Sequence, residues 1–182
     1  IRKNIFFNLS GIVKDERTLF TMNEVQVSLV SSDKVSIKIF TNEDGYYAFD
    51  STMFEEDKTY RLHISKDNFF SVSNDISTFE YTDNHNFVYD VLLKPIPEEP
   101  IMLPDILYDL GRWDLKPQYQ DSLMVLVKIL NDNPNLIIEL RSHTDSRASL
   151  EFNDDLSQKR AQTVVDFLVG KGIDPGQLVA KG

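Results

Sequence analysis

A proline-rich segment divides this chain into two halves with different hydrophobic periods. Four of the seven prolines, together with two adjacent glutamates, fall within residues 94–104. Proline lacks a backbone donor and favours extended backbone, so this stretch is typical of a semi-rigid connector. We therefore predict two domains, residues 1–94 and 105–182, joined by a linker at residues 95–104.

Upstream of the prolines, apolar and polar residues alternate in short runs. The runs cover residues 25–29, 35–39, 60–64 and 87–93, and turn-forming residues separate them at 31–33, 42–45, 66–68 and 82–84. A period of two marks half-buried strands, and no helical period interrupts them. This half is predicted to be a small antiparallel all-β sandwich.

Downstream of the prolines, strand-like and helix-like segments alternate. Residues 106–110 and 136–140 read as strands, and residues 117–130 and 153–169 read as helices. The first helix carries an apolar stripe of Leu123, Leu126, Val127 and Leu130. Strands that alternate with helices favour a β-α-β-α unit with parallel strands, so this half is predicted to be an α/β domain.

Composition excludes several classes of function. The net charge of −10 argues against binding to nucleic acid or to an anionic membrane surface. The chain has no cysteine, and its three histidines are far apart, so we expect no metal site and no cofactor. No apolar run is long enough to cross a bilayer. Because the chain begins at Ile1, we expect a piece of a longer protein, with any targeting or lipid-anchoring segment outside it.

One arginine stands out on the second predicted helix. At 100° per residue, Arg160 falls between Phe167 and Val164, inside the apolar arc. A guanidinium on that side must be paired, because it cannot lose its proton. Asp145 follows the preceding strand and should emerge at the same end of the sheet. The two residues either bridge each other or receive the ammonium and carboxylate of a ligand, and the pattern alone leaves both readings open.

The second half resembles the OmpA-like peptidoglycan-binding family. Residues 153–168 match the signature N-x-x-L-S-x-x-R-A-x-x-V-x-x-x-L, and residues 142–146 (SHTDS) are similar to the family's G-H-T-D segment, with Ser142 in place of the usual glycine. The resemblance implies that Asp145 binds the ammonium of diaminopimelate in the peptidoglycan stem peptide. Arg160 would bind its carboxylate, and Asn153 would support the pocket.

The resemblance also nominates residues around that pocket. The loop after the first strand implies lining positions at Tyr108, Asp109 and Gly111. Arg147 occupies a position that is usually small or polar, where it either contacts the wall or is solvated. The family domain normally continues beyond residue 182, so we expect a domain truncated at its C-terminus, without a further strand.

The first half resembles a carboxypeptidase regulatory-like domain, which is a transthyretin-like (prealbumin-like) sandwich. The resemblance rests on Gly11-x-Val13-x-Asp15, on residues 41–49 with their Asp-Gly-Tyr turn, and on residues 60–64. It implies a spacer or a protein-interaction module rather than a peptidase, since the sequence has no H-x-x-E pair.

Together, these features lead to the hypothesis of a non-enzymatic anchor in a Gram-negative envelope. The domain pairing resembles Bacteroidota envelope proteins, including accessory lipoproteins of the type IX secretion system. The expected partners are the peptidoglycan stem peptide and an envelope protein bound through the sandwich. The expected location is the periplasm, associated with the outer membrane. The alternatives are a stator or motility component that grips the wall, and an enzyme acting on cell-wall peptides.

Overall fold

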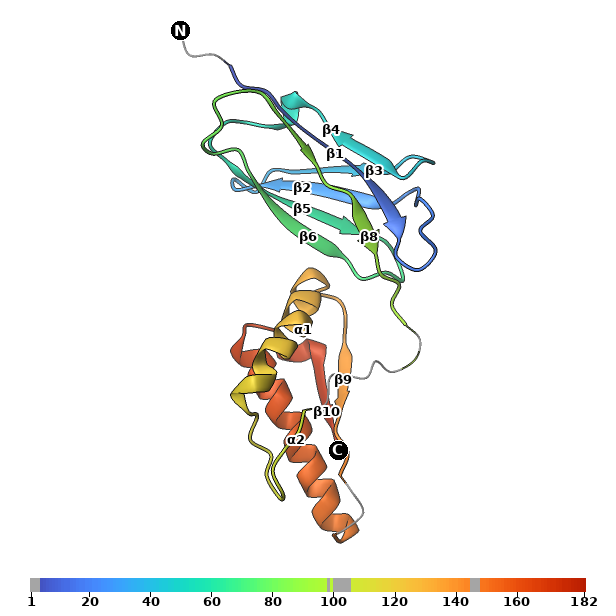
Figure 1. The fold of residues 1–182 in the computed structure, drawn as a ribbon, viewed down its shortest axis with the longest axis vertical. Coiled ribbons are helices and arrows are strands. Elements are labelled where there is room, and N and C mark those ends of the chain that lie inside the picture. The colour runs from blue at the N-terminus through green and yellow to red at the C-terminus, as the bar shows by residue number, and fades with distance from the viewer. Residues whose placement is uncertain (1–3, 98, 100–105, 145–147) are drawn as a thin grey trace. The chain divides into compact units, whose positions relative to one another are not determined.

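The computed structural model describes residues 4–97, 99, 106–144 and 148–182 (Figure 1). The chain forms two compact units, Ile1–Glu98 and Glu99–Gly182, and each is described here by itself. Most of the predicted linker, residues 95–104, lies outside the described residues. Within the described part of the chain, no helix is long and apolar enough to cross a membrane.

The first unit contains two β-sheets. One sheet has the order β4-β1-β7, with β8 also paired to β1, and the other has the order β3-β2-β5-β6. The strands are β1 (Phe7–Asp15), β2 (Gln26–Ser31), β3 (Ser36–Phe40), β4 (Tyr46–Phe49), β5 (Thr59–Ser65), β6 (Val72–Ser77), β7 (His85–Val88) and β8 (Val91–Leu93), with a 3₁₀ turn at Ser51–Met53.

Both sheets contribute to one apolar core. Val27 pairs with Ile64 across β2 and β5, and Leu9 pairs with Phe49 across β1 and β4. All four side chains are buried in the same cluster. The alternating runs therefore predicted these buried faces, except at Val35, which lies outside β3 and is 62% exposed. Two sheets around one core confirm a small all-β sandwich.

The prediction of a wholly antiparallel sandwich was wrong. β7 and β8 both run parallel to β1. β6 belongs to the β3-β2-β5-β6 sheet, so the chain crosses from that sheet to the other before β7. β7 then runs beside β1 in the same direction. The predicted strand at 87–93 is divided in two, because the carboxylate of Asp90 accepts the Ile12 backbone N–H at 2.8 Å, in place of a ladder carbonyl.

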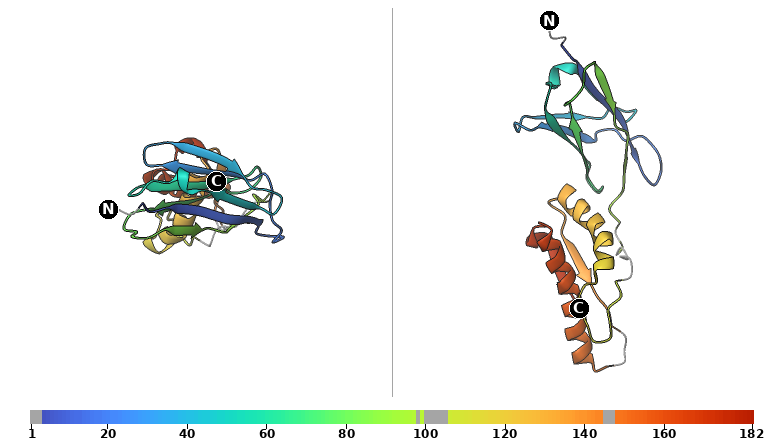
Figure 2. Two further views of the ribbon diagram at one scale, coloured as in Figure 1. Left: turned by 90° about the horizontal axis from the view of Figure 1, so that it is seen from above. Right: turned by 60° about the vertical axis from the view of Figure 1, so that its left-hand side comes forward.

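The second unit packs two helices against two parallel strands (Figure 2). Its elements are a 3₁₀ turn at Pro117–Tyr119, α1 (Gln120–Asp132), β9 (Ile138–Arg141), α2 (Leu150–Gly170), a 3₁₀ turn at Pro175–Gln177 and β10 (Leu178–Lys181). β10 pairs with β9 in parallel, with Leu178 opposite Ile138. Leu123, Val127 and Leu130 are buried against Val164 and Leu168, which confirms the apolar stripe of the first helix.

The predicted strand at residues 106–110 does not form. Gly111 adopts a positive φ of 66° and turns the chain, and the Asp109 carbonyl accepts the Arg112 backbone N–H at 2.9 Å. This carbonyl also receives a bond from α2, so the segment is held by a turn and a helix rather than by a strand ladder. The described order is therefore α-β-α-β, where the sequence predicted β-α-β-α.

Candidate functional site

Arg160 lies in the third turn of α2, near the carboxyl ends of the strands. The helix starts one turn earlier than predicted, because the Ser149 hydroxyl accepts the Phe152 backbone N–H at 3.3 Å and caps it. Gln158 exchanges hydrogen bonds with the end of β10, accepting the Gly182 N–H at 2.9 Å and donating to the Ala180 carbonyl at 3.3 Å. These bonds hold this part of α2 beside the strand ends.

The loop after residue 107 contacts the Arg160 side chain through one ring and two carbonyls. The guanidinium carbon of Arg160 lies 4.7 Å from the centre of the Tyr108 ring. Its Nε donates to the Arg112 carbonyl at 2.9 Å, and its Nη2 reaches the Asp109 carbonyl at 3.5 Å. Arg160 is half-buried rather than enclosed in the core. The predicted pairing requirement is thus met in part by a ring face and two main-chain carbonyls.

The partner expected for this charge is a carboxylate. Within residues 4–97, 99, 106–144 and 148–182, no carboxylate oxygen lies within 4.0 Å of the Arg160 guanidinium, and no hydrogen bond uses its Nη1. Asp145 and Arg147 lie outside the described residues. The relationship of Asp145 to Arg160 therefore stays a prediction, whether it is a bridge or one half of a ligand clamp.

Asn153 holds the entry to α2. Its side-chain amide donates to the Ala148 carbonyl at 3.3 Å, so it ties the first turn of the helix to the chain just before it. Ala148 lies three residues after Asp145 in the sequence. The contact fits a residue that positions this loop, and no described contact brings Asn153 to Arg160.

The three positions nominated on the first loop have different roles. Tyr108 supplies the ring under Arg160, and its hydroxyl donates to the Arg160 carbonyl at 3.3 Å. Burial raises the pKa of the Tyr108 hydroxyl, while the charge of Arg160 acts in the opposite direction. Asp109 contributes its carbonyl to Arg160 but directs its carboxylate to Lys116. Gly111 provides the turn, and nothing lies within 4 Å of its missing Cβ.

An ion pair braces this loop from its other side. The Lys116 ammonium donates to the Asp109 carboxylate at 2.7 Å. This bond lowers the pKa of Asp109 and raises the pKa of Lys116. The Asp109 carboxylate therefore pairs with Lys116 of the same loop and does not neutralise the charge of Arg160.

The sequence interpretation missed three residues of this arrangement. Arg112 acts through its carbonyl, which no side-chain pattern reveals. Trp113 packs beside α2, with the Lys159 ammonium 4.8 Å from its ring centre. Lys116 lies seven residues from Asp109, a spacing that carries no meaning outside a helix. In the part of the chain that the structure describes, no group of three potential metal-binding side chains occurs.

Comparison with known proteins identifies the second unit. Residues 107–182 match the OmpA family. They form an OmpA-family domain. Over 80 residues this chain is 39% identical to outer membrane protein A of Shimwellia blattae and 39% identical to that of Klebsiella pneumoniae. The aligned part is 43% of this chain, but it spans 33% and 23%, respectively, of those proteins.

A solved structure resembles the same domain. The peptidoglycan-associated lipoprotein from Burkholderia pseudomallei is 30% identical, with a TM-score of 0.40. The match covers 42% of this chain and 67% of that one. The OmpA-family domain contains Arg160, Asn153, Tyr108, Asp109 and Gly111, so all of the described candidate residues fall within the matched part of the chain.

Proposed function

We propose that the OmpA-family domain binds peptidoglycan by clamping the diaminopimelate of its stem peptide. In this proposal Arg160 receives the side-chain carboxylate and Asp145 receives the ammonium on the same carbon. Asn153 holds the loop that carries Asp145. The chain would thus anchor an outer-membrane or periplasmic protein to the cell wall, with no catalytic step.

The observation that carries this proposal is the setting of Arg160. Its guanidinium is fixed by a ring face and two neutral carbonyls, and it has no carboxylate partner within the described residues. Neutral acceptors orient the cation without cancelling its charge, so it remains able to form a charge-assisted bond with an anion. Its place beside the strand ends is also where open α/β layers commonly bind ligands.

The clamp would distinguish diaminopimelate from lysine. Lysine lacks the terminal carboxylate, so a lysine-containing stem peptide would leave Arg160 without its anionic partner. The lost bond and the uncompensated desolvation cost on the order of 2–5 kcal/mol. Calorimetry with the two stem peptides tests this difference directly, and equal affinities would remove the assignment of Arg160 to that carboxylate.

Binding itself is tested by co-sedimentation with insoluble peptidoglycan. Arg160→Ala and Asp145→Ala are each expected to abolish sedimentation while the protein stays folded. Arg141→Ala is the matched control, because Arg141 pairs with Glu139 on β9 rather than with the loop. Wild-type sedimentation by both folded variants would refute the clamp.

The proposal for the whole protein assigns the first unit to protein interaction. Its two-sheet core and its resemblance to carboxypeptidase regulatory-like domains support a spacer or interaction module. The pairing of the two domains supports a Bacteroidota envelope lipoprotein that serves type IX secretion. We expect the full-length gene to encode a lipoprotein signal. We also expect a knockout strain to secrete less type IX cargo. Normal secretion in that strain would exclude this role.

A further inference from the structure

The first unit contains a strand with one unpaired edge. β7 pairs through residues 85–88 with residues 7–10 of β1, and no other strand within residues 4–97 pairs with it. The backbone N–H groups of His85 and Tyr89 donate to the Phe6 and Ser10 carbonyls of the β1 segment. Successive residues of a strand direct their backbone groups to opposite sides, so those of Asn86 and Val88 point to the free edge.

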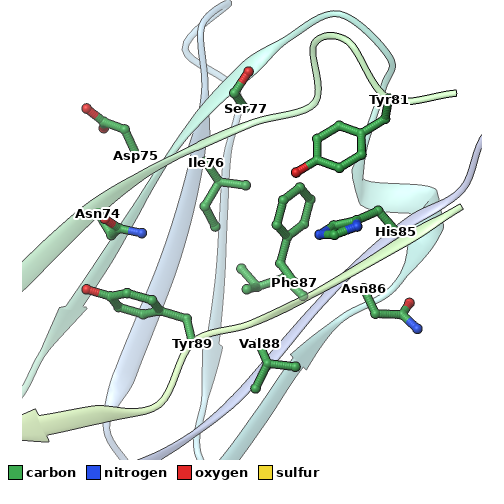
Figure 3. A pocket seen from close by; sticks show the side chains of 11 residues that line it. Asn74, Asp75, Ile76, Ser77, Tyr81, His85, Asn86, Phe87, Val88 and Tyr89 are labelled. Carbon is green, nitrogen blue, oxygen red and sulfur yellow. The ribbon is translucent and has the colours of Figure 1, made fainter. Parts of the chain in front are cut away.

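A hollow of about 380 Å³ lies beside this edge, between β7 and β6, the edge strand of the other sheet (Figure 3). Aromatic rings form much of its wall. The Tyr81 and His85 rings are centred 4.4 Å apart, and the His85 and Phe87 rings 4.6 Å apart. Ile76 of β6 contributes an apolar side chain from the facing strand. The hollow therefore offers a recess lined by rings, by apolar side chains such as Ile76, and by polar side chains such as Asn74 and Ser77. It lies next to backbone groups that no other strand pairs within residues 4–97.

The surroundings of the recess are acidic. Residues 72–90, which include both edge strands and their connection, contain four acidic residues and no lysine or arginine. Asp75 pairs with Arg61 at 3.0 Å, whereas Glu80 forms no salt bridge within the described residues. A second hollow of about 340 Å³ shares Tyr81 with the first and is lined by Glu56, Asp57 and Glu80.

The acidic character of residues 72–90 distinguishes between two kinds of binding partner for this edge. A second copy of the chain would bring the same acidic segment against itself, and like charges at an interface oppose association. A basic strand meets an opposite charge instead. Edge strands that are not blocked by lysine, proline or a bulge accept an added strand through their backbone groups.

We propose that the free edge of β7 binds an extended basic peptide segment of another protein, which adds to the sheet as a strand. One apolar side chain of the segment enters the recess between β6 and β7, and flanking lysine or arginine side chains face Glu80 and its neighbours. The inference rests on the proposed role of the first unit as an interaction module, and specifies the chemistry of its partner.

The test uses the full chain and a fluorescein-labelled peptide of alternating lysine and valine with a central leucine. The same peptide with glutamate in place of lysine is the control. We expect saturable anisotropy with the lysine peptide, at least tenfold weaker binding of the glutamate peptide, and weakening with added salt. Val88→Pro removes one outward N–H and should weaken binding about tenfold, whereas Val88→Ala, which keeps the N–H, should change it less than twofold.

A second pair of variants tests the charge independently of the backbone. Glu80→Lys should weaken binding severalfold, and Glu43→Lys, an equal change of charge on the turn before β4, should not. This pair decides the question if Val88→Pro fails to fold. Absence of lysine-peptide binding, equal binding of both peptides, or wild-type affinity of folded Val88→Pro would overturn the proposal. So would wild-type affinity of Glu80→Lys, or self-association of the wild type that Val88→Pro abolishes.

The peptide assay does not involve the cell wall. A chain that sediments with peptidoglycan but ignores the lysine peptide would refute this proposal and leave the wall-binding function intact. The reverse result would refute wall binding alone. Binding of a chito-oligosaccharide to the recess, with no binding of the lysine peptide, would identify a sugar site and also overturn the peptide proposal.

Discussion

Tyr108 and Arg160 contact each other twice, through different atoms. The guanidinium lies 4.7 Å from the centre of the Tyr108 ring, and the Tyr108 hydroxyl donates to the Arg160 backbone carbonyl at 3.3 Å. The ring therefore supports the charged end of the side chain while the hydroxyl reaches the helix that carries it. This double contact ties the loop after residue 107 to α2.

Removing the ring should weaken wall binding more than removing the hydroxyl. Tyr108→Leu loses the cation–π contact, worth about 1 kcal/mol at a partly exposed site, and we expect about fivefold weaker co-sedimentation with peptidoglycan. Tyr108→Phe keeps the ring face and should bind within twofold of the wild type. Equal losses in the two variants would show that the hydroxyl, and not the ring, holds Arg160.

The Asp109–Lys116 pair predicts a dependence of the loop on pH. The hydrogen bond from Lys116 lowers the pKa of Asp109 below its usual range. A lowered pKa means that the stabilisation is complete above the unfolded value and is lost as pH falls through the folded value. A carboxyl titration by NMR should give a depressed pKa for Asp109, and Lys116→Gln should return it to the ordinary range. An unchanged titration in Lys116→Gln would contradict the ion pair.

Gly11 should not tolerate any side chain. A Cβ there would overlap the Tyr89 carbonyl oxygen and lie 2.9 Å from Cε1 of Tyr47. Neither neighbour can yield easily, because the buried Tyr47 hydroxyl donates to that same carbonyl at 2.7 Å. We expect Gly11→Ala to destabilise the first unit by about 3 kcal/mol, seen as faster hydrogen exchange of the β1 amides.

Gly170→Ala is the control for that experiment, since nothing lies within 4 Å of its Cβ position. It should leave the β1 amides unaffected. Wild-type exchange of those amides in Gly11→Ala would show that β1 and the Tyr89 backbone can separate at little cost.

Gln177 donates hydrogen bonds to backbone carbonyls at the C-terminal end of α1 and just after it. Its buried side-chain nitrogen lies 3.3, 3.0 and 3.1 Å from the carbonyl oxygens of Leu130, Asn133 and Leu136. Gln177→Met keeps the shape but leaves these carbonyls without that donor, which should cost about 2 kcal/mol. Urea unfolding followed by the fluorescence of Trp113, the chain's single tryptophan, measures the loss in the second unit.

Gln162→Met provides the matched control, because Gln162 is exposed and bonds to Asp166 one helical turn away. Its urea midpoint should stay close to that of the wild type. A similar shift in both variants would mean that the carbonyls near Gln177 find other donors.

The fold was predictable in the segments where the spacing of apolar residues shows which face is buried. Val27 and Leu29 alternate with polar residues because one face of β2 meets the core, and Leu123 and Val127 recur at helical spacing for the same reason. The parallel pairing of β7 with β1 was not predictable, since it depends on which sheet the chain enters after β6. Residues 106–110 have the composition of a strand, but a strand also needs a partner, and composition does not show one.

The setting of the candidate residue Arg160 was predictable only as far as its own position on the helix defines it. The position of Arg160 on the helical wheel marked it as anomalous, and its half-burial beside Tyr108 agrees with that. Its contacts with the Asp109 and Arg112 carbonyls could not be foreseen, because every residue has a carbonyl and only the turn at Gly111 directs these two. The pairing with Asp145 stays a prediction.

Main-chain anchoring has a consequence for the evolution of this surface. Because residues 109 and 112 hold Arg160 through their carbonyls, beside the ring of Tyr108, these two positions can exchange residue types without releasing it, provided that the turn at Gly111 persists. Lineages can therefore alter charge and size around the arginine while the arginine itself stays in place.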